Sequence, residues 1–254
     1  MAELDPTAFE ASAPLFFSIV MPAYNEEDVV DATLQALGDQ LNADGFSYEI
    51  IVVNDHSADN TAEIIDAAAR RNAHIKRIDN EGPGGYGNAI RCGLAHYQGD
   101  AAVIVTADGS DAPKDVAAYF RKIEEGFDCA FGSRFGPGAT VTDYPRFKLF
   151  MNRVANRLIG MILKSKYNDF TNGFKCYRRC VIDDMQPLLA GQFNITIELV
   201  VKAVLGGWRY AVVPTDWTQR DAGESSFKLF KLMKPYAATF LYCLTADYIK
   251  KVKR

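Results

Sequence analysis

The 254-residue sequence has few of the residues that form disulfide frameworks or thiolate metal sites. It contains three histidines and five cysteines, an odd number with no Cys-x-x-Cys pair. Cys176 and Cys180 lie four residues apart, but no nearby histidine or second cysteine pair completes a zinc-ligand set. We therefore expect structural thiols that stay reduced in a reducing compartment.

Long apolar runs and an excess of positive charge are also missing. No window of about 18 uninterrupted apolar residues occurs, and the nearest approach, 235–249, carries Asp247. Residues 1–14 lack the basic and apolar regions of a signal peptide and are expected to form a flexible tail. The formal net charge of −4 argues against a general affinity for nucleic acid.

Between residues 16 and 134, short apolar runs alternate with amphipathic segments. We expect strands at 16–21, 48–53, 74–78, 101–106 and 127–133, separated by helices at 26–41, 57–71, 88–97 and 113–124. This alternation is typical of an α/β domain with a mostly parallel sheet and helices on both faces. Beyond it we expect helices at 145–163 and 195–205, a strand at 208–213, and a helix at 227–251 with a break or fresh start at Pro235.

Polar residues follow the predicted strands where each strand ends. They are Tyr24 and Glu26, Asp55, Asp108 with Asp111, and Arg134. Ligands of such sheets bind beyond the carboxyl ends of the strands, so the sequence predicts a binding site at this edge.

A glycine-rich segment, 82–87, fits the Gly-x-Gly-x-x-Gly pattern of dinucleotide-binding folds. Asp108 lies at a distance that would suit ribose binding, which makes a dehydrogenase an alternative. The pattern normally follows the first strand, but here two strand–helix units come first. Pro83 also occupies a position where a backbone N–H would face pyrophosphate. The other interpretation is a tight turn that needs glycine for positive φ.

Eight segments together resemble the family 2 inverting glycosyltransferases, most closely the dolichyl-phosphate or polyprenyl-phosphate mannose and glucose synthases. The segments are 20–27, 51–57, 84–89, 107–108, 132–134, 169–175, 197–198 and 220–225. They occur in the family's order across most of the chain. The resemblance implies a GT-A-like α/β domain over 15–226. Residues 227–254 would form a basic amphipathic helix, part of the same domain or associated with a membrane.

On the donor side, the resemblance implies a nucleotide-sugar site for GDP-mannose or a UDP-hexose. Asp55 would hydrogen-bond the nucleobase. The rest of the nucleotide pocket would comprise Pro22, Tyr24, Glu26, Val53, Ala107 and Asp108. Mg²⁺ or Mn²⁺ would be held by Asp108, Ser110 and Asp111, since these metals take oxygen ligands. Arg134 and Arg220 would hold phosphates, for which the arginine fork is suited.

On the acceptor side, the resemblance implies a polyprenyl or dolichyl phosphate, held by Arg146, Lys148 and Ser225. A lipid phosphate is already an anion and needs cationic positioning. A hydroxyl acceptor would instead need a carboxylate base, for which Asp169 is the candidate. Asp108, Arg134, Asp169 and Arg220 form the implied catalytic set, and transfer would invert the anomeric carbon. The expected location is the cytoplasmic face of a membrane, reached by peripheral contact or through a membrane-anchoring partner.

Two positions depart from the family's pattern. Thr106 replaces the first carboxylate of the usual Asp-x-Asp, and Ser226 stands where relatives often have lysine, with Lys228 nearby. These departures leave open a family 2 transferase acting on a glycan hydroxyl and a non-catalytic nucleotide-sugar-binding protein. Structural roles also remain open for single residues. Asp55, Asp108 and Asp111 could cap helices, and Glu198 could be a buried carboxylate paired with a cation.

Overall fold

In the computed structural model, the described residues are 14–142, 146–218 and 226–252, without the side chains of 217–218 and 226–233. Two predicted site residues, Arg220 and Ser225, lie outside the described residues, as does nearly all of the predicted tail.

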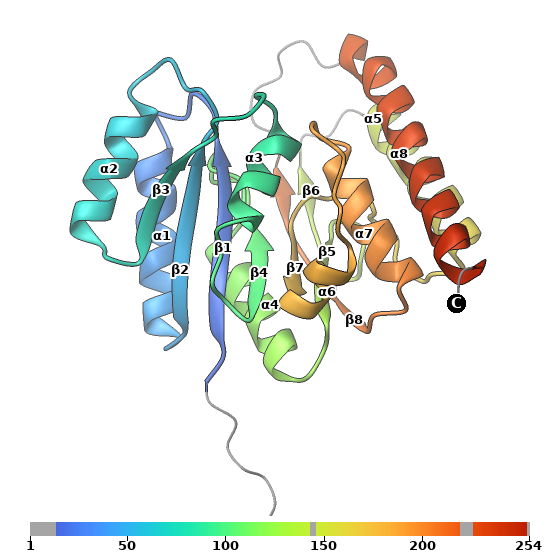
Figure 1. The fold of residues 1–254 in the computed structure, drawn as a ribbon, viewed down its shortest axis with the longest axis horizontal. Helices are drawn as coiled ribbons and strands as arrows, with labels where there is room; N and C mark the ends of the chain where they lie inside the picture. The colour runs from blue at the N-terminus through green and yellow to red at the C-terminus, as the bar shows by residue number, and fades with distance from the viewer. Residues whose placement is uncertain (1–13, 143–145, 219–225, 253–254) are drawn as a thin grey trace, which may run out of the picture.

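A seven-stranded sheet with the order β3-β2-β1-β4-β7-β5-β8 forms the centre of the protein (Figure 1). Every neighbouring pair is parallel except those made by β7, which runs antiparallel to both β4 and β5. The mostly parallel α/β sheet is therefore confirmed. The strands are β1 (Phe16–Ala23), β2 (Ser47–Asn54), β3 (Ile75–Asp79), β4 (Ala101–Ile104), β5 (Cys129–Ser133), β7 (Lys175–Arg178) and β8 (Tyr210–Pro214). A separate small sheet pairs β6 (Val141–Thr142) with β9 (Trp217–Thr218).

Helices cover both faces of the sheet because successive strand residues point to opposite sides. Ile19 and Met21 of β1 pack into the core under α1, α2 and α4, whereas Val20 packs into the core under α3, α6 and α7. The helices are α1 (Val30–Ala43), α2 (Thr61–Arg71), α3 (Tyr86–Leu94), α4 (Pro113–Glu124), α5 (Arg146–Leu163), α6 (Arg179–Asp184), α7 (Ile195–Leu205) and α8 (Ser226–Val252). No helix of the described residues is both long and apolar enough to span a membrane.

The predicted helices 57–71 and 88–97 differ in their bounds from α2 and α3, and two further helix predictions need correction. The predicted break at Pro235 is wrong, because α8 continues through it. A proline inside a helix costs about 3 kcal/mol; here α8 packs against α7 and buries Cys243, which offsets that cost. The first helix begins at Val30 and not at residue 26, because the carbonyl of Glu26 accepts the N–H groups of both Val29 and Val30 in a preceding turn.

Candidate functional site

Loops from six strands meet at one edge of the sheet. The parallel strands β1, β2, β3, β4 and β5 all end there. Because β7 runs the other way, its first residue lies at the same edge, where Lys175 pairs with Ile104 of β4 and Phe131 of β5. The segment 169–174 therefore arrives beside the ends of β4 and β5. This reversal assembles the site from residues that are distant in sequence.

The Asp55 carboxylate is held in place after β2. Its Oδ1 accepts a 2.6 Å hydrogen bond from Asn80 Nδ2, and its Oδ2 accepts a 2.7 Å bond from the Gly85 N–H. The backbone N–H of Asp55 donates a hydrogen bond to the carbonyl of Ala23. The next residue after Ala23 is Tyr24, whose side chain is highly exposed. Pro22 and Val53 pair in the β1–β2 register. The structure thus brings together most of the residues predicted to bind the nucleoside.

The glycine-rich segment packs against another part of the same chain. A Cβ atom on Gly85 would lie 2.6 Å from the carbonyl oxygen of Gly191, and one on Gly87 would lie 2.5 Å from that of Ala190. Gly85 also has φ +133°, a conformation that suits glycine. The space that a pyrophosphate would need beside these residues is filled by the backbone of 190–192. The pattern therefore serves chain packing and not dinucleotide binding.

Gly87→Ala is expected to lower the free energy of unfolding by about 1–3 kcal/mol, because the added methyl group must displace the backbone at Ala190. Urea denaturation measures this. Gly136→Ala is the matched control, since its nearest contact at 3.5 Å is ordinary, and it should stay within about 0.5 kcal/mol of wild type. Equal stability of the two variants would contradict the packing role.

Glu198 has the structural role that the sequence left open. Its carboxylate is fully buried, accepts the backbone N–H groups of Leu189 and Ala190, and ion-pairs with Lys202 at 2.6 Å. It therefore fixes the segment that supports the glycine-rich turn.

Thr106 connects the two carboxylates that follow β4. Its Oγ1 lies 2.7 Å from Oδ1 of Asp108 and 2.9 Å from Oδ2 of Asp111. The N–H of Thr106 also donates to Asp111, and that of Ser110 to Asp108. Burial raises the pKa of Asp111 to about 6, hydrogen bonds from Thr106 oppose the rise, and the negative charges of Asp108 and Asp115 add to it.

This donor set fits a hard divalent cation. Within the described residues, the second carboxylate oxygens, Oδ2 of Asp108 and Oδ1 of Asp111, accept no hydrogen bond. A cation between the carboxylates would also relieve their mutual repulsion. The described part of the chain contains no group of three or more His, Cys, Asp or Glu that could hold a metal. An ion here would therefore depend on hydroxyl, water and phosphate oxygens for its remaining ligands, as Mg²⁺ commonly does.

Arg134 and Asp169 form a buried pair at the end of β5. Arg134 donates to Asp169 from Nε at 2.8 Å, from Nη2 at 2.7 Å and from its backbone N–H at 2.9 Å. The carboxylate is fully buried and the arginine side chain is 10% exposed. Nη2 also reaches Thr171 Oγ1, which accepts a hydrogen bond from Asn152 of α5. Both carboxylate oxygens are thus occupied in orienting the guanidinium.

Lys148 lies close to this pair. Partial burial lowers its pKa, and the positive charge of Arg134 lowers it further. Arg146 is the other cation predicted to bind the acceptor, and it lies at the exposed start of α5, the helix that also carries Lys148. The structure therefore places two cations near one another, one from β5 and one from α5.

Sequence reasoning did not single out Lys175, the first residue of β7. Its side chain is buried, and its ammonium group donates to the carbonyl of Asn172, within the loop that supplies Asp169. Burial lowers its pKa to about 7; the Asp169 carboxylate opposes this shift and Arg134 adds to it. The available signal was a lysine that stands between two apolar residues, Phe174 and Cys176.

Lys175 predicts a pH-dependent stability. Between about pH 7 and pH 10 the unfolded chain binds a proton at Lys175 that the folded chain lacks, so the contribution of this residue to stability should rise with pH, with a slope approaching about 1.4 kcal/mol per unit. Lys175→Met should remove this contribution, while the exposed Lys76→Met should retain it. Denaturant unfolding across this range measures both, and equal slopes would contradict the prediction.

Comparisons with known proteins now identify the family. The model of glycosyl transferase family 2 matches residues 18–185. The chain belongs to glycosyl transferase family 2. This confirms the family to which the resemblance pointed and excludes the dehydrogenase alternative.

Two relatives are similar over most of this chain. Glycosyltransferase AglD of Haloferax volcanii is 31% identical over 219 residues, which are 83% of this chain and 34% of that protein. The chain thus spans about a third of that relative. Polyprenol monophosphomannose synthase of Mycolicibacterium smegmatis is 27% identical over 213 residues, which are 82% of this chain and 79% of that protein.

Solved structures show the same fold. Glucosyl-3-phosphoglycerate synthase of Mycobacterium tuberculosis matches with a TM-score of 0.69 and 18% identity, over 90% of this chain and 80% of that chain. Further structures of that enzyme contain Mn²⁺, uridine diphosphate and phosphoglyceric acid, or Mg²⁺ and uridine diphosphate; each covers 90% of this chain, with TM-scores of 0.68. The predicted GT-A-like fold is confirmed.

Proposed function

We propose that this protein is an inverting glycosyltransferase that moves a hexose from GDP-mannose or a UDP-hexose to a polyprenyl or dolichyl phosphate. The observation that carries the proposal is the arrangement of charged side chains on the acceptor side of the site. Arg134 and Lys148 bring positive charge to the end of β5, while Asp169 is occupied by Arg134. A phosphate acceptor needs such positioning, whereas a hydroxyl acceptor needs an available base.

The relatives support this choice of acceptor. One is by name a polyprenol monophosphomannose synthase, and it is similar along most of both chains. In this proposal Asp169 orients Arg134, and Arg134, Lys148 and Arg146 hold the acceptor phosphate. Arg220 and Ser225, which lie outside the described residues, would add contacts to phosphates.

On the donor side, Asp55 would bind the base and Tyr24 would stack on it, with Pro22, Glu26, Val53 and Ala107 around the nucleoside. Asp108, Asp111 and Ser110 would hold Mg²⁺ or Mn²⁺, which when bound offsets the negative charge that builds on the departing diphosphate. Thr106 keeps both carboxylates aligned, so the missing first aspartate does not leave them unsupported.

Transfer would take place in one displacement. An oxygen of the acceptor phosphate forms a bond to the anomeric carbon from the side opposite the leaving group. The bond from that carbon to the diphosphate breaks, and the nucleoside diphosphate leaves with the electron pair. No proton has to be removed from the acceptor, which agrees with a buried and paired Asp169. Because the acceptor is a membrane lipid, we place the enzyme at the cytoplasmic face of a membrane.

A donor screen against a short-chain prenyl phosphate tests the function. GDP-mannose, UDP-glucose and UDP-galactose are each supplied with and without Mn²⁺. We expect one donor to yield the glycosyl prenyl phosphate and free nucleoside diphosphate, with turnover dependent on the metal. Turnover on an oligosaccharide alone would establish the glycan-hydroxyl alternative. Donor binding without turnover on either acceptor would establish a non-catalytic role.

A further inference from the structure

Helix α5 presents its apolar side chains to the outside of the protein. The exposed residues include Phe150, at 63%, and Met161, at 59%. At 3.6 residues per turn the whole set falls within a sector of about 120°. The set is Phe147, Phe150, Val154, Leu158, Met161 and Ile162. The only buried residues of the helix, Asn156 and Gly160, lie on the opposite side and face the protein.

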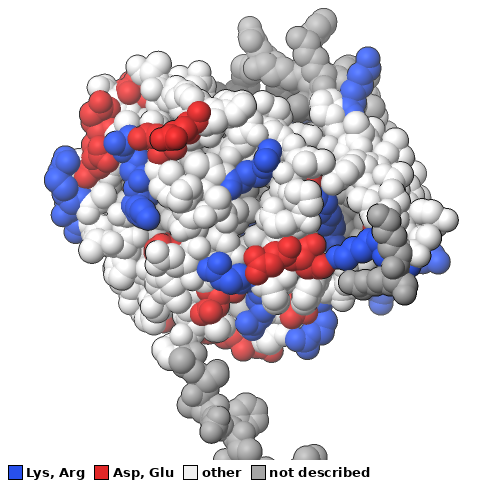
Figure 2. All heavy atoms as spheres, in the orientation of Figure 1, with Lys and Arg blue, Asp and Glu red and all other residues white. Residues whose placement is uncertain are grey.

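Positive charge accompanies this apolar stripe. Residues 146–166 contain no aspartate or glutamate and carry six cations, in a chain whose net charge is −4. The cations are Arg146, Lys148, Arg153, Arg157, Lys164 and Lys166. In contrast, the face shown in Figure 2 mixes acidic and basic side chains. The positive charge of α5 and the loop that follows it is therefore not offset by any carboxylate within this segment.

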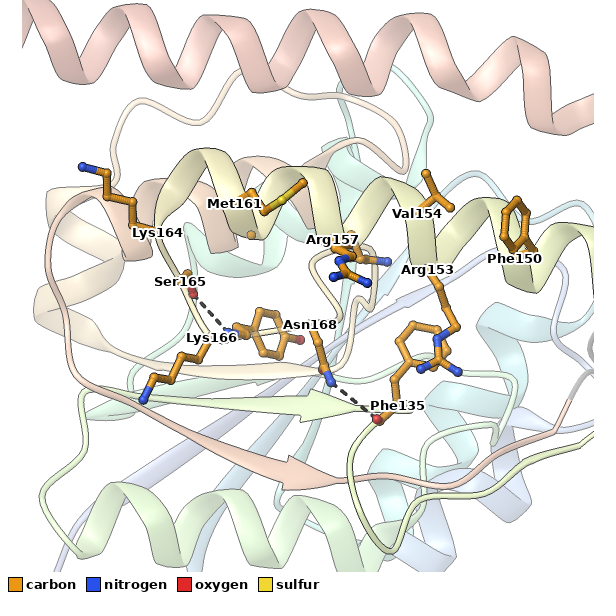
Figure 3. Close-up of a pocket in the computed structure, with 13 residues that line it drawn as sticks. Phe135, Phe150, Arg153, Val154, Arg157, Met161, Lys164, Ser165, Lys166 and Asn168 are labelled. Carbon is orange, nitrogen blue, oxygen red and sulfur yellow. Dashed lines mark hydrogen bonds between the residues drawn. The ribbon is translucent and has the colours of Figure 1, made fainter.

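An open pocket of about 780 Å³ lies along one flank of the stripe, between α5 and the loop 164–168 (Figure 3). Arg153 and Arg157 point from α5 into this pocket, and three residues of the apolar stripe, Phe150, Val154 and Met161, also line it. No residue of the described chain that lines the pocket is acidic. The guanidinium of Arg153 lies 5.6 Å from the ring centre of Phe135, the residue after Arg134. The pocket thus begins next to the proposed acceptor site.

We propose that the outward face of α5, with this cationic pocket on its flank, binds the surface of a bilayer that contains anionic phospholipid. Apolar side chains would enter the boundary between headgroups and acyl chains, and the cations would contact lipid phosphates. This proposal rests on the proposed function, because an enzyme that acts on a membrane-embedded acceptor needs a face that meets the membrane.

Charge and apolar area together favour a membrane over other occupants. Two copies meeting through α5 would bring together faces that each carry six cations and no carboxylate. A nucleic acid would match the charge but leave the apolar stripe in water. Helix α8 also exposes Leu241, Tyr248 and Ile249, but its Lys250 and Lys251 are paired with Asp184 and Asp247. By sequence, 146–166 has six cations and no carboxylate, against five lysines and one aspartate in α8, so the positive charge is greater on α5 and the loop after it.

Co-sedimentation of the full chain with vesicles tests the proposal. The wild type should bind vesicles of phosphatidylcholine mixed with phosphatidylglycerol at least about tenfold more tightly than phosphatidylcholine alone, and salt should weaken the binding. Arg157→Glu with Lys164→Glu should abolish this preference. The matched control, Arg70→Glu with Lys76→Glu, reverses exposed charges on α2 and β3, near the far end of the sheet (Figure 1), and should not affect binding.

The apolar contribution has its own matched pair of variants. Phe150→Ser with Leu158→Ser should weaken binding to the mixed vesicles by at least about tenfold, because two apolar side chains would no longer move from water into the membrane boundary. Leu189→Ser with Val212→Ser removes two comparably exposed side chains elsewhere and should leave binding unchanged. Absence of wild-type binding, equal binding to both vesicle types, or a salt-resistant dimer disrupted by the α5 variants would each overturn the proposal.

Turnover on a short, water-soluble prenyl phosphate separates this proposal from the proposed function. The α5 variants should keep wild-type turnover on that acceptor. If these variants lost turnover on the soluble acceptor as strongly as they lost vesicle binding, the membrane role would be overturned and the pocket would belong to the reaction site. Wild-type vesicle binding without sugar transfer to any prenyl phosphate would overturn the proposed function and leave the membrane surface supported.

Discussion

Asp108→Asn is expected to lower kcat for sugar transfer by about 100- to 1,000-fold, the range seen when one electrostatic contact to a developing charge is removed. Asparagine keeps the shape and can still accept hydrogen bonds from Thr106 Oγ1 and the Ser110 N–H, so the loop should stay folded. It loses the negative charge that attracts the cation. Binding of Mn²⁺, followed by calorimetry, should weaken in parallel with turnover.

Asp79→Asn is the matched control for this variant. Asp79 is a carboxylate at the end of β3, at the same edge of the sheet, but it is half exposed and paired with Arg77. Its replacement should leave turnover and Mn²⁺ affinity near wild type. If Asp108→Asn kept full turnover while donor binding was sound, Asp108 would not be part of the reaction site.

Breaking the Arg134–Asp169 pair is expected to have the largest combined effect on stability and activity. Asp169→Asn leaves the guanidinium without its buried counter-charge, which should cost about 3–5 kcal/mol of stability. Arg134→Met leaves a buried carboxylate unpaired and should cost a similar amount. It should also lower kcat/KM for the prenyl phosphate by at least about 100-fold, because the cation that we propose to position the acceptor is lost.

The double variant, Arg134→Met with Asp169→Asn, separates the two effects. Removing both charges should recover much of the lost stability, since neither member of the pair is left buried without the other. Turnover should not recover, because no cation remains at this position. The exposed pair Arg121–Asp44 is the control, and Arg121→Met should cost less than about 1 kcal/mol. Recovery of turnover in the double variant would show that the pair only stabilises the fold.

The sequence placed most of the residues proposed for the donor half of the site at one edge of the sheet because they follow strands in a regular pattern. Asp55 follows β2 and Asp108 follows β4, so a parallel sheet brings them to one edge without further information. The glycine pattern at 82–87 was open to two interpretations, because residue identity alone did not reveal that the backbone of 190–192 occupies the space beside Gly85 and Gly87. In the sequence, Thr106 was notable only because it replaces a carboxylate. In the structure it forms hydrogen bonds with both Asp108 and Asp111, the carboxylates that remain.

The sequence by itself determined the α/β class, the edge of the sheet at which the candidate site residues lie, and the family. Hydrophobic periodicity and short motifs are local properties, and these conclusions depend on them. Only the tertiary structure decided the direction of β7 and its insertion between β4 and β5. That insertion brings Asp169 to Arg134, 35 residues away along the chain, and places Lys175 close enough to interact electrostatically with both. Strand order and direction depend on long-range packing and backbone hydrogen bonds, which no local pattern specifies.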